Sequence, residues 1–153
     1  MERIVVATDG SPSSAAAVAF GVDLAAEHGS ELAFVHVVPR LDVVPTTGIG
    51  GFGCAFPHEP CKHDHELLAD AAAVAAEHGV VSTTALLRGH TVDEIVAYAD
   101  SHDADLIVVG SRGHGAIASA LLGSVSHGVL KETKRQVLVV RPETVPAPVG
   151  VAG

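Results

Sequence analysis

The stretch that decides the fold is "DADLIVVGSRGHGAIASALLGSVS", residues 103–126. An apolar run ends at Gly110, and the segment from Ser111 to Ser126 is rich in glycine and serine and contains no acidic residue. A segment of this kind can be a flexible loop, a tight structural turn or a cradle for phosphate. The surrounding pattern must decide, because a phosphate-binding loop leaves a strand and opens a helix.

Short apolar runs alternate with helical patterns along the chain. The runs are rich in β-branched residues and predict five buried strands, at 3–9, 31–38, 81–87, 105–110 and 136–141. The helical patterns cover 11–29, 65–79, 91–102 and 124–133, and Thr91 with Glu94 has the spacing of a capping box. This alternation predicts an α/β fold whose parallel sheet is covered by helices on both faces.

Composition limits the classes of function. The chain has 153 residues, of which 48% are hydrophobic and 3% aromatic, so we expect one globular domain with a Val, Leu, Ile and Ala core. A net charge of -9 and few aromatic residues argue against nucleic-acid binding. Asp9 and Asp23 interrupt the best candidates for a signal peptide and a membrane span, which predicts a cytoplasmic protein with no membrane span.

Two strand ends carry residues suited to a ligand. Asp9 and Gly10 follow the first strand, and the glycine stretch follows the fourth, so the two loops share one crevice if those strands are neighbours. The helix that starts at Ser124 offers unpaired N–H groups to an anion, and Arg112 adds a cation. The G-x-G-x-x-G match at 48–53 lies between prolines instead of between a strand and a helix, so we interpret it as a flexible loop.

The glycine stretch resembles the motif of one family. Gly110-x-x-Gly113, nine residues and then Gly123-Ser124 match the G-2x-G-9x-G-[S/T] pattern of the ATP-binding branch of the universal stress protein family. "VVATDGS", "FVHVV" and "VLVVR" also look like that family, so the resemblance covers residues 2–142. It implies a Rossmann-like domain over 1–142 with strand order 3-2-1-4-5, and a homodimer, which we place at the fifth strand. Residues 143–153 are expected to form a C-terminal tail.

The resemblance also implies a binding site for ATP, and the Asp9 carboxylate could hold a Mg²⁺ ion through the phosphates. Ala7 and Thr8 would line the base, Asp9 would accept hydrogen bonds from the ribose, and the backbone of Val37 would meet the adenine. Ribose and phosphates would be held by Gly110, Gly113, Gly123, Ser124, Val125 and Ser126, with Arg112 and His114 within reach. His36 is more typical of a structural histidine whose ring nitrogens are hydrogen-bonded.

We expect an ATP-binding regulatory protein of the stress response with slow or no hydrolysis, because no paired acids accompany the glycine loop. One alternative is an ATP hydrolase that acts as a timed switch. Another is a metal or stress sensor in the long loop expected at 39–64, which holds the metal-ligand candidates Cys54, His58, Cys61 and His63, with His65 just beyond it. Their spacing is not that of a standard zinc finger, and a surface loop rich in histidine explains it equally well.

Overall fold

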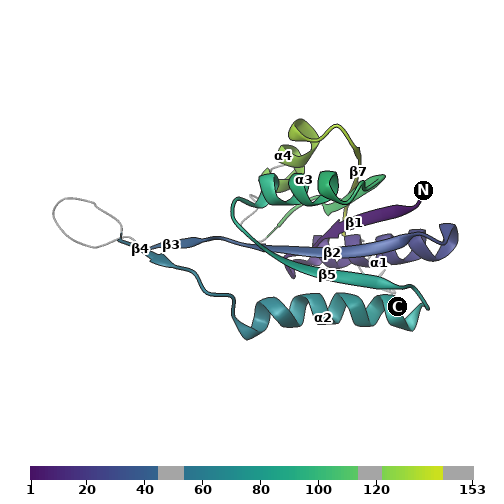
Figure 1. Cartoon of the computed structure of the whole chain (residues 1–153), viewed down its shortest axis with the longest axis horizontal. Coiled ribbons are helices and arrows are strands. Elements are labelled where there is room, and N and C mark those ends of the chain that lie inside the picture. Colours follow the sequence, from purple (N-terminus) through teal and green to yellow (C-terminus); the bar gives the residue numbers. More distant parts are fainter. Residues whose placement is uncertain (45–53, 114–121, 143–153) are drawn as a thin grey trace, which may run out of the picture.

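A computed structural model describes residues 1–44, 54–113 and 122–142, and within 41–44 and 54–57 it describes the backbone alone. Five parallel strands form the main sheet, and four helices pack on it (Figure 1). In chain order the elements are β1 (Arg3–Ala7), α1 (Pro12–His28), β2 (Glu31–Val38), β3 (Leu41–Val44), β4 (Cys54–Pro57), α2 (Lys62–Glu77), β5 (Ser82–Arg88), α3 (Thr91–Ser101), β6 (Leu106–Gly110), α4 (Ser124–Glu132) and β7 (Gln136–Val140).

The sheet has the order β5-β2-β1-β6-β7. Counted along the five parallel strands this is 3-2-1-4-5, which confirms the predicted topology. The central strand β1 pairs with both β2 and β6, so that Val5 lies between Ala33 and Ile107. The strand order reverses at β1, and the C-terminal ends of β1 and β6 are therefore neighbours. Ligands of open α/β sheets bind at such a reversal.

Two apolar clusters lie on the two faces of the sheet, because successive strand side chains point to opposite sides. Phe34 and the strand side chains on the same face of the sheet pack with α1 and α2, whereas Val35, on the opposite face, packs with α3 and α4. In Figure 1, α3 and α4 lie above the sheet and α2 lies below it. None of the helices in the described residues is long and apolar enough to cross a membrane.

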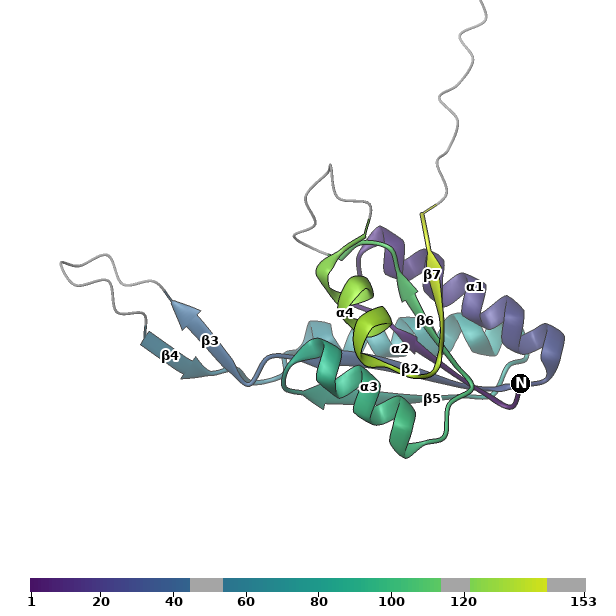
Figure 2. The same cartoon turned by 90° about the horizontal axis from the view of Figure 1, so that it is seen from above.

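The segment expected as one long loop is more ordered than its prolines and glycines indicated. β3 and β4 pair antiparallel, from Leu41 opposite Pro57 to Val44 opposite Cys54, and form an arm that extends away from the sheet (Figures 1 and 2). Helix α2 begins at Lys62, three residues earlier than predicted, because Asp64 accepts a hydrogen bond from the Cys61 N–H and caps the first turn. The G-x-G-x-x-G match and the C-terminal tail lie outside the described residues.

The capping-box prediction for α3 was wrong. Thr91 is the first residue of the helix, and His90 holds the N-cap position without a side-chain hydrogen bond. The Glu94 N–H donates to the His90 carbonyl, so the first turn is closed by the backbone. This placement has a consequence for function, because it puts Thr91 at the edge of the cavity described next.

Candidate functional site

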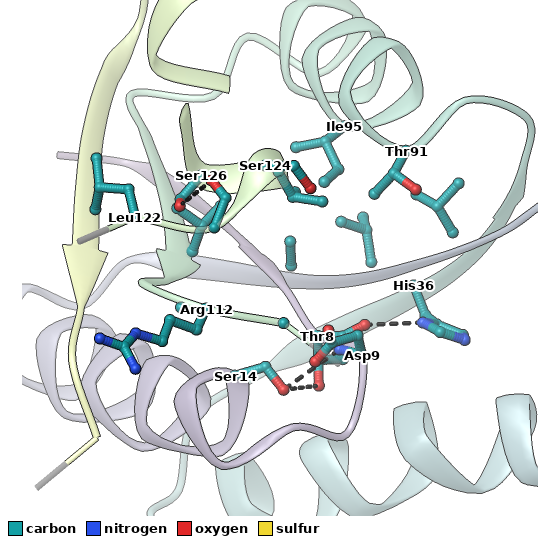
Figure 3. A pocket seen from close by; sticks show the side chains of 18 residues that line it. Thr8, Asp9, Ser14, His36, Thr91, Ile95, Arg112, Leu122, Ser124 and Ser126 are labelled. Atoms are coloured by element: carbon teal, nitrogen blue, oxygen red, sulfur yellow. Dashed lines mark hydrogen bonds between the residues drawn. The ribbon is translucent and has the colours of Figure 1, made fainter. Parts of the chain in front are cut away.

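A cavity of about 410 Å³ opens where the strand order reverses (Figure 3). This volume lies within the roughly 300–1,000 Å³ range of small-molecule and cofactor sites. The described residues that line it come from the C-terminal ends of three central strands, the loops that follow them, and the starts of α1, α3 and α4. They are Ala7, Thr8, Asp9, Ser14, Val35, His36, Val37, Thr91, Ile95, Val109, Gly110, Arg112, Gly113, Leu122, Gly123, Ser124, Val125 and Ser126.

All the nucleotide-site residues predicted from the sequence for the described parts of the chain line this one cavity, while His114 lies outside those parts. The lining residues that sequence reasoning missed are Ser14, Val35, His36, Thr91, Ile95, Val109 and Leu122. Val35 and Val109 lie in apolar runs that indicate only strand core. Thr91 and Ile95 lie on one face of α3, because they are four residues apart. This spacing indicates a shared role in the cavity lining only once the packing of α3 against β2 is known.

The Asp9 segment is fixed by the start of α1. One Asp9 carboxylate oxygen accepts the Ser11 N–H at 2.9 Å, and the Asp9 N–H donates to the Ser14 hydroxyl oxygen at 3.3 Å. Thr8 continues the β1–β2 ladder, because its N–H donates to the Val35 carbonyl at 2.9 Å. Asp9 therefore plays the part of a turn aspartate and also presents its carboxylate at the cavity.

Two glycines allow backbone segments to approach closely at this edge. A Cβ atom on Gly110 would lie 2.6 Å from the Ser13 carbonyl carbon, and one on Gly113 would lie 2.7 Å from Asp9 Oδ2. A Cβ atom essentially never lies this close to a non-bonded atom, so any side chain at either position forces its neighbour to move. Glycine is needed at position 110 because β6 packs closely against α1. At position 113 it is needed because the backbone lies beside the Asp9 carboxylate in the cavity lining.

The N-terminus of α4 forms the wall opposite β1. Gly123 is the N-cap residue, and its N–H donates to the Ser111 carbonyl at 2.6 Å, which ties the two ends of the glycine stretch together. The first intrahelical bond runs from the His127 N–H to the Gly123 carbonyl, so the N–H groups of the first turn point out of the helix. This end of α4 carries a partial positive charge suited to an anion.

The two serines of α4 differ in a way that the sequence did not show. Ser124 is exposed at the cavity, whereas Ser126 is only 1% exposed. The Ser126 hydroxyl lies 3.0 Å from the Gly123 carbonyl and 3.2 Å from the Ser111 carbonyl, so its one hydrogen braces the loop. We had expected both hydroxyls to bond to phosphate. In this structure the Ser124 side chain is exposed at the cavity, whereas the Ser126 hydroxyl is engaged with the carbonyls of the loop.

The lining carries both signs of charge. The Arg112 side chain is exposed beside the glycine stretch, and Asp9 provides the carboxylate among the described lining residues. Figure 3 shows Thr8, Asp9 and Ser14 on one side of the space, with Ser124, Ile95 and Thr91 across from them. The arrangement can hold a molecule with an apolar ring near Val37 and Ile95 and an anionic group at α4.

His36 has partners on both ring nitrogens, which confirms the expectation of a structural histidine. Nδ1 lies 2.8 Å from the Thr8 carbonyl oxygen, and Nε2 lies 2.9 Å from Asp64 Oδ1. The pKa of Asp64 is lowered from 3.8 to about 2, chiefly because its carboxylate accepts the Cys61 N–H; burial opposes this effect and the bond to His36 adds to it. The Asp64 carboxyl is therefore ionised at neutral pH.

The described residues do not support the metal-site hypothesis. No group of three or more His, Cys, Asp and Glu side chains placed to hold a metal ion occurs among them. Cys61 and His63 are exposed at the start of α2, and His58 lies before it. The side chain of Cys54 lies outside the described part of the chain, so that candidate stays a prediction.

The fold and the cavity define a Rossmann-like α/β protein with a cavity at the reversal of its strand order. The model of the universal stress protein family matches residues 1–141. The chain is 38% identical to universal stress protein YxiE of Bacillus subtilis, over 91% of this chain and 98% of that protein. It is 36% identical to a universal stress protein of Methanocaldococcus jannaschii, over 92% of this chain and 82% of that protein. The chain belongs to the universal stress protein family.

Solved structures agree with this assignment. A universal stress protein crystallised in complex with cAMP is 30% identical, with a TM-score of 0.69 over 93% of this chain and 98% of that one. A universal stress protein from Archaeoglobus fulgidus in complex with dAMP has a TM-score of 0.66 at 24% identity, over 92% of this chain and 98% of that one, which shows the shared fold.

Proposed function

We propose that this chain binds ATP in the cavity at the end of β1 and acts as a regulatory protein of the stress response, with slow or no hydrolysis. The observation that carries the proposal is that both halves of the glycine motif and the N-terminus of α4 line one cavity. The relative crystallised with cAMP supports an adenine nucleotide as the ligand class. The choice of ATP among adenine nucleotides rests on the glycine motif at residues 110–124.

The cavity suggests how the nucleotide is oriented. The adenine would lie between Val37 and Ile95, and the ribose hydroxyls would donate to Asp9. The phosphates would meet the first-turn N–H groups of α4, where anions are stabilised. Ser124 and Arg112 would add one donor and one cation, which allows an acidic protein to hold a polyanion locally.

Binding without rapid turnover fits the acids at the site. Phosphoryl transfer to water usually employs a metal held by several oxygen ligands and a group that orients the water. Among the described lining residues, Asp9 is the acid that could reach an Mg²⁺ ion, and such an ion would share the phosphates. We therefore favour a binding protein over a timed hydrolase.

We also propose that the protein is a homodimer that pairs through β7. This strand lies at one edge of the sheet, and Val137–Val140 are partly exposed there. Unpaired edge strands are covered or paired in native proteins, and antiparallel pairing about a two-fold axis would cover both copies. The cytoplasmic location expected from the sequence stays a prediction.

Calorimetry with ATP on nucleotide-free protein tests the site. In the Gly123→Val variant a Cβ lies 3.2 Å from Arg112 Cα and 3.4 Å from Gly113 N, so the side chain presses on the backbone of the glycine stretch at the proposed phosphate site. We expect affinity to fall at least about tenfold, or about 1.4 kcal/mol. Gly29→Ala, at the end of α1 with nothing within 4 Å of the new Cβ, is the control for loss of stability alone. Equal affinity of parent and Gly123→Val would place the site elsewhere.

A further inference from the structure

One side chain connects the cavity to helix α2. His36 lies on β2, but its ring points away from Val35 and Val37, because neighbouring strand residues face opposite sides of the sheet. In Figure 3 the ring lies below the strand, with its bond to Thr8 drawn as a dashed line. The other ring nitrogen bonds to Asp64 in the first turn of α2.

The chemistry of the two partners fixes the protons on this ring. A carbonyl oxygen only accepts, so Nδ1 must carry a hydrogen to bond to Thr8 at 2.8 Å. The contact of 2.9 Å between Nε2 and Asp64 Oδ1 also needs a hydrogen, carried by one of the two groups. The Asp64 carboxylate already accepts the Cys61 N–H at 2.8 Å and lies at a helix N-terminus, both of which favour its ionised form.

The second hydrogen therefore belongs to His36, which makes its ring an imidazolium. The side chains of His36 and Asp64 are 10% and 12% exposed, so little water competes with the pair. Within the described residues, the Thr8 carbonyl and the Asp64 carboxylate are the hydrogen-bond partners of the two ring nitrogens. Asp9 follows Thr8 on the cavity side, and Leu86, the neighbour of His36 on β5, is apolar. A charged ring between an acceptor on each side satisfies both contacts.

The residue that His36 holds belongs to the cavity. Thr8 lines it directly, and the next residue is Asp9, which we propose binds the ribose. Two strand ends converge here, because the Thr8 N–H bonds to Val35 while its carbonyl bonds to the His36 ring. Loss of the ring bond frees the last carbonyl before the Asp9 turn.

On its other side the bridge reaches the base of the β3–β4 arm. Asp64 caps α2 through Cys61, and the residues just before it are clamped to the sheet: Arg88 donates to the His58 carbonyl, and the His58 N–H donates to the Arg40 carbonyl at 3.0 Å. The first turn of α2 and the Thr8–Asp9 segment are thus joined by hydrogen bonds through His36, and the arm base precedes that turn directly along the chain.

We propose that His36 is a positioning residue of the nucleotide site, held as an imidazolium between the Thr8 carbonyl and the Asp64 carboxylate, so that the start of α2 sets the geometry of the Thr8–Asp9 segment and with it the affinity for nucleotide. The effect on affinity rests on the function proposed above. The protonation of the ring does not, and it is measured without any ligand.

The first measurement is the ¹⁵N NMR spectrum of the His36 ring in nucleotide-free protein at neutral pH. We expect both ring nitrogens to be protonated in the parent. In Asp64→Asn the amide can donate to Nε2 while its oxygen accepts the Cys61 N–H, so the ring should become a neutral Nδ1–H tautomer with the bridge intact. A parent ring with a single protonated nitrogen would overturn the assigned charge.

The second measurement is ATP affinity by calorimetry in three variants. His36→Leu removes the bridge, and His36→Leu with Asp64→Leu removes it without leaving a buried charge unpaired, which keeps the test valid if the single variant does not fold. Both should bind ATP about three- to tenfold more weakly, the usual worth of one hydrogen bond. Asp64→Asn should lose less than either, because it rescues the bridge.

The control is His65→Gln, an exposed histidine one residue beyond Asp64, which should bind like the parent. Parental affinity in the folded double variant would overturn the positioning role. Failure of the parent itself to bind any adenine nucleotide would overturn the proposed function and the affinity claim with it, while the NMR result would still decide the charge of the ring.

Discussion

The ionised Asp64 gives a prediction about acid stability whose size follows from the structure. A pKa lowered from 3.8 to about 2 corresponds to about 2 kcal/mol of folding free energy at neutral pH. Because the folded-state pKa is the lower one, this contribution is fully present above the unfolded pKa. It is lost as the pH falls from about 5 to about 1, where Asp64 is protonated in both states.

Asp64→Asn should therefore be less stable than the parent by up to about 2 kcal/mol at neutral pH, and the difference should shrink towards zero in acid. Guanidinium unfolding followed by circular dichroism at a series of pH values measures it. Asp70→Asn, an exposed site on the same helix, is the matched control and should follow the parent. A variant as stable as the parent at neutral pH, or a difference that persists in acid, would refute the reasoning.

Three further changes test packing and assembly. Gly10→Ala should lower thermal stability more than Gly29→Ala. Both glycines have positive φ, which strains an alanine by about 1–2 kcal/mol, but at position 10 the new Cβ also lies 2.6 Å from a leucine methyl group. Gly128→Ala should destabilise by about 1–3 kcal/mol, because its Cβ would lie 2.6 Å from Val92 on α3, and Val92→Ala should recover part of that loss in a double-mutant cycle. Val139→Lys on the β7 edge should convert a dimer to a monomer in sedimentation, and a parent that sediments only as the 15.5 kDa species would contradict the dimer.

The sequence was sufficient to predict the sheet and most of the cavity lining. Buried parallel strands are continuous apolar runs, and the glycines at 110, 113 and 123 mark places where backbone meets backbone or a carboxylate, so both signals are local. The arm was missed because β3 and β4 are four-residue strands at the ends of a segment rich in proline and glycine. Such composition favours a loop.

The parts that could not be predicted depend on contacts between distant residues. His36 and Asp64 are separated by 28 positions, and neither residue type indicates the other as a partner. Ser124 and Ser126 look equivalent in the sequence, yet the return of the loop places the Ser111 carbonyl beside only the second hydroxyl. Thr91 and Ile95 join the cavity because α3 crosses the end of β2, a feature of tertiary packing.

The measurement that tests the central claim most directly is mass spectrometry of small molecules released when the purified protein is denatured, combined with calorimetry of the emptied protein. The account predicts that ATP is released in amounts up to one per chain and that the emptied protein binds it again, with Gly123→Val deficient in both. Protein that releases no adenine nucleotide and gives no heat with ATP, while its fold is intact by circular dichroism, would contradict the proposed function.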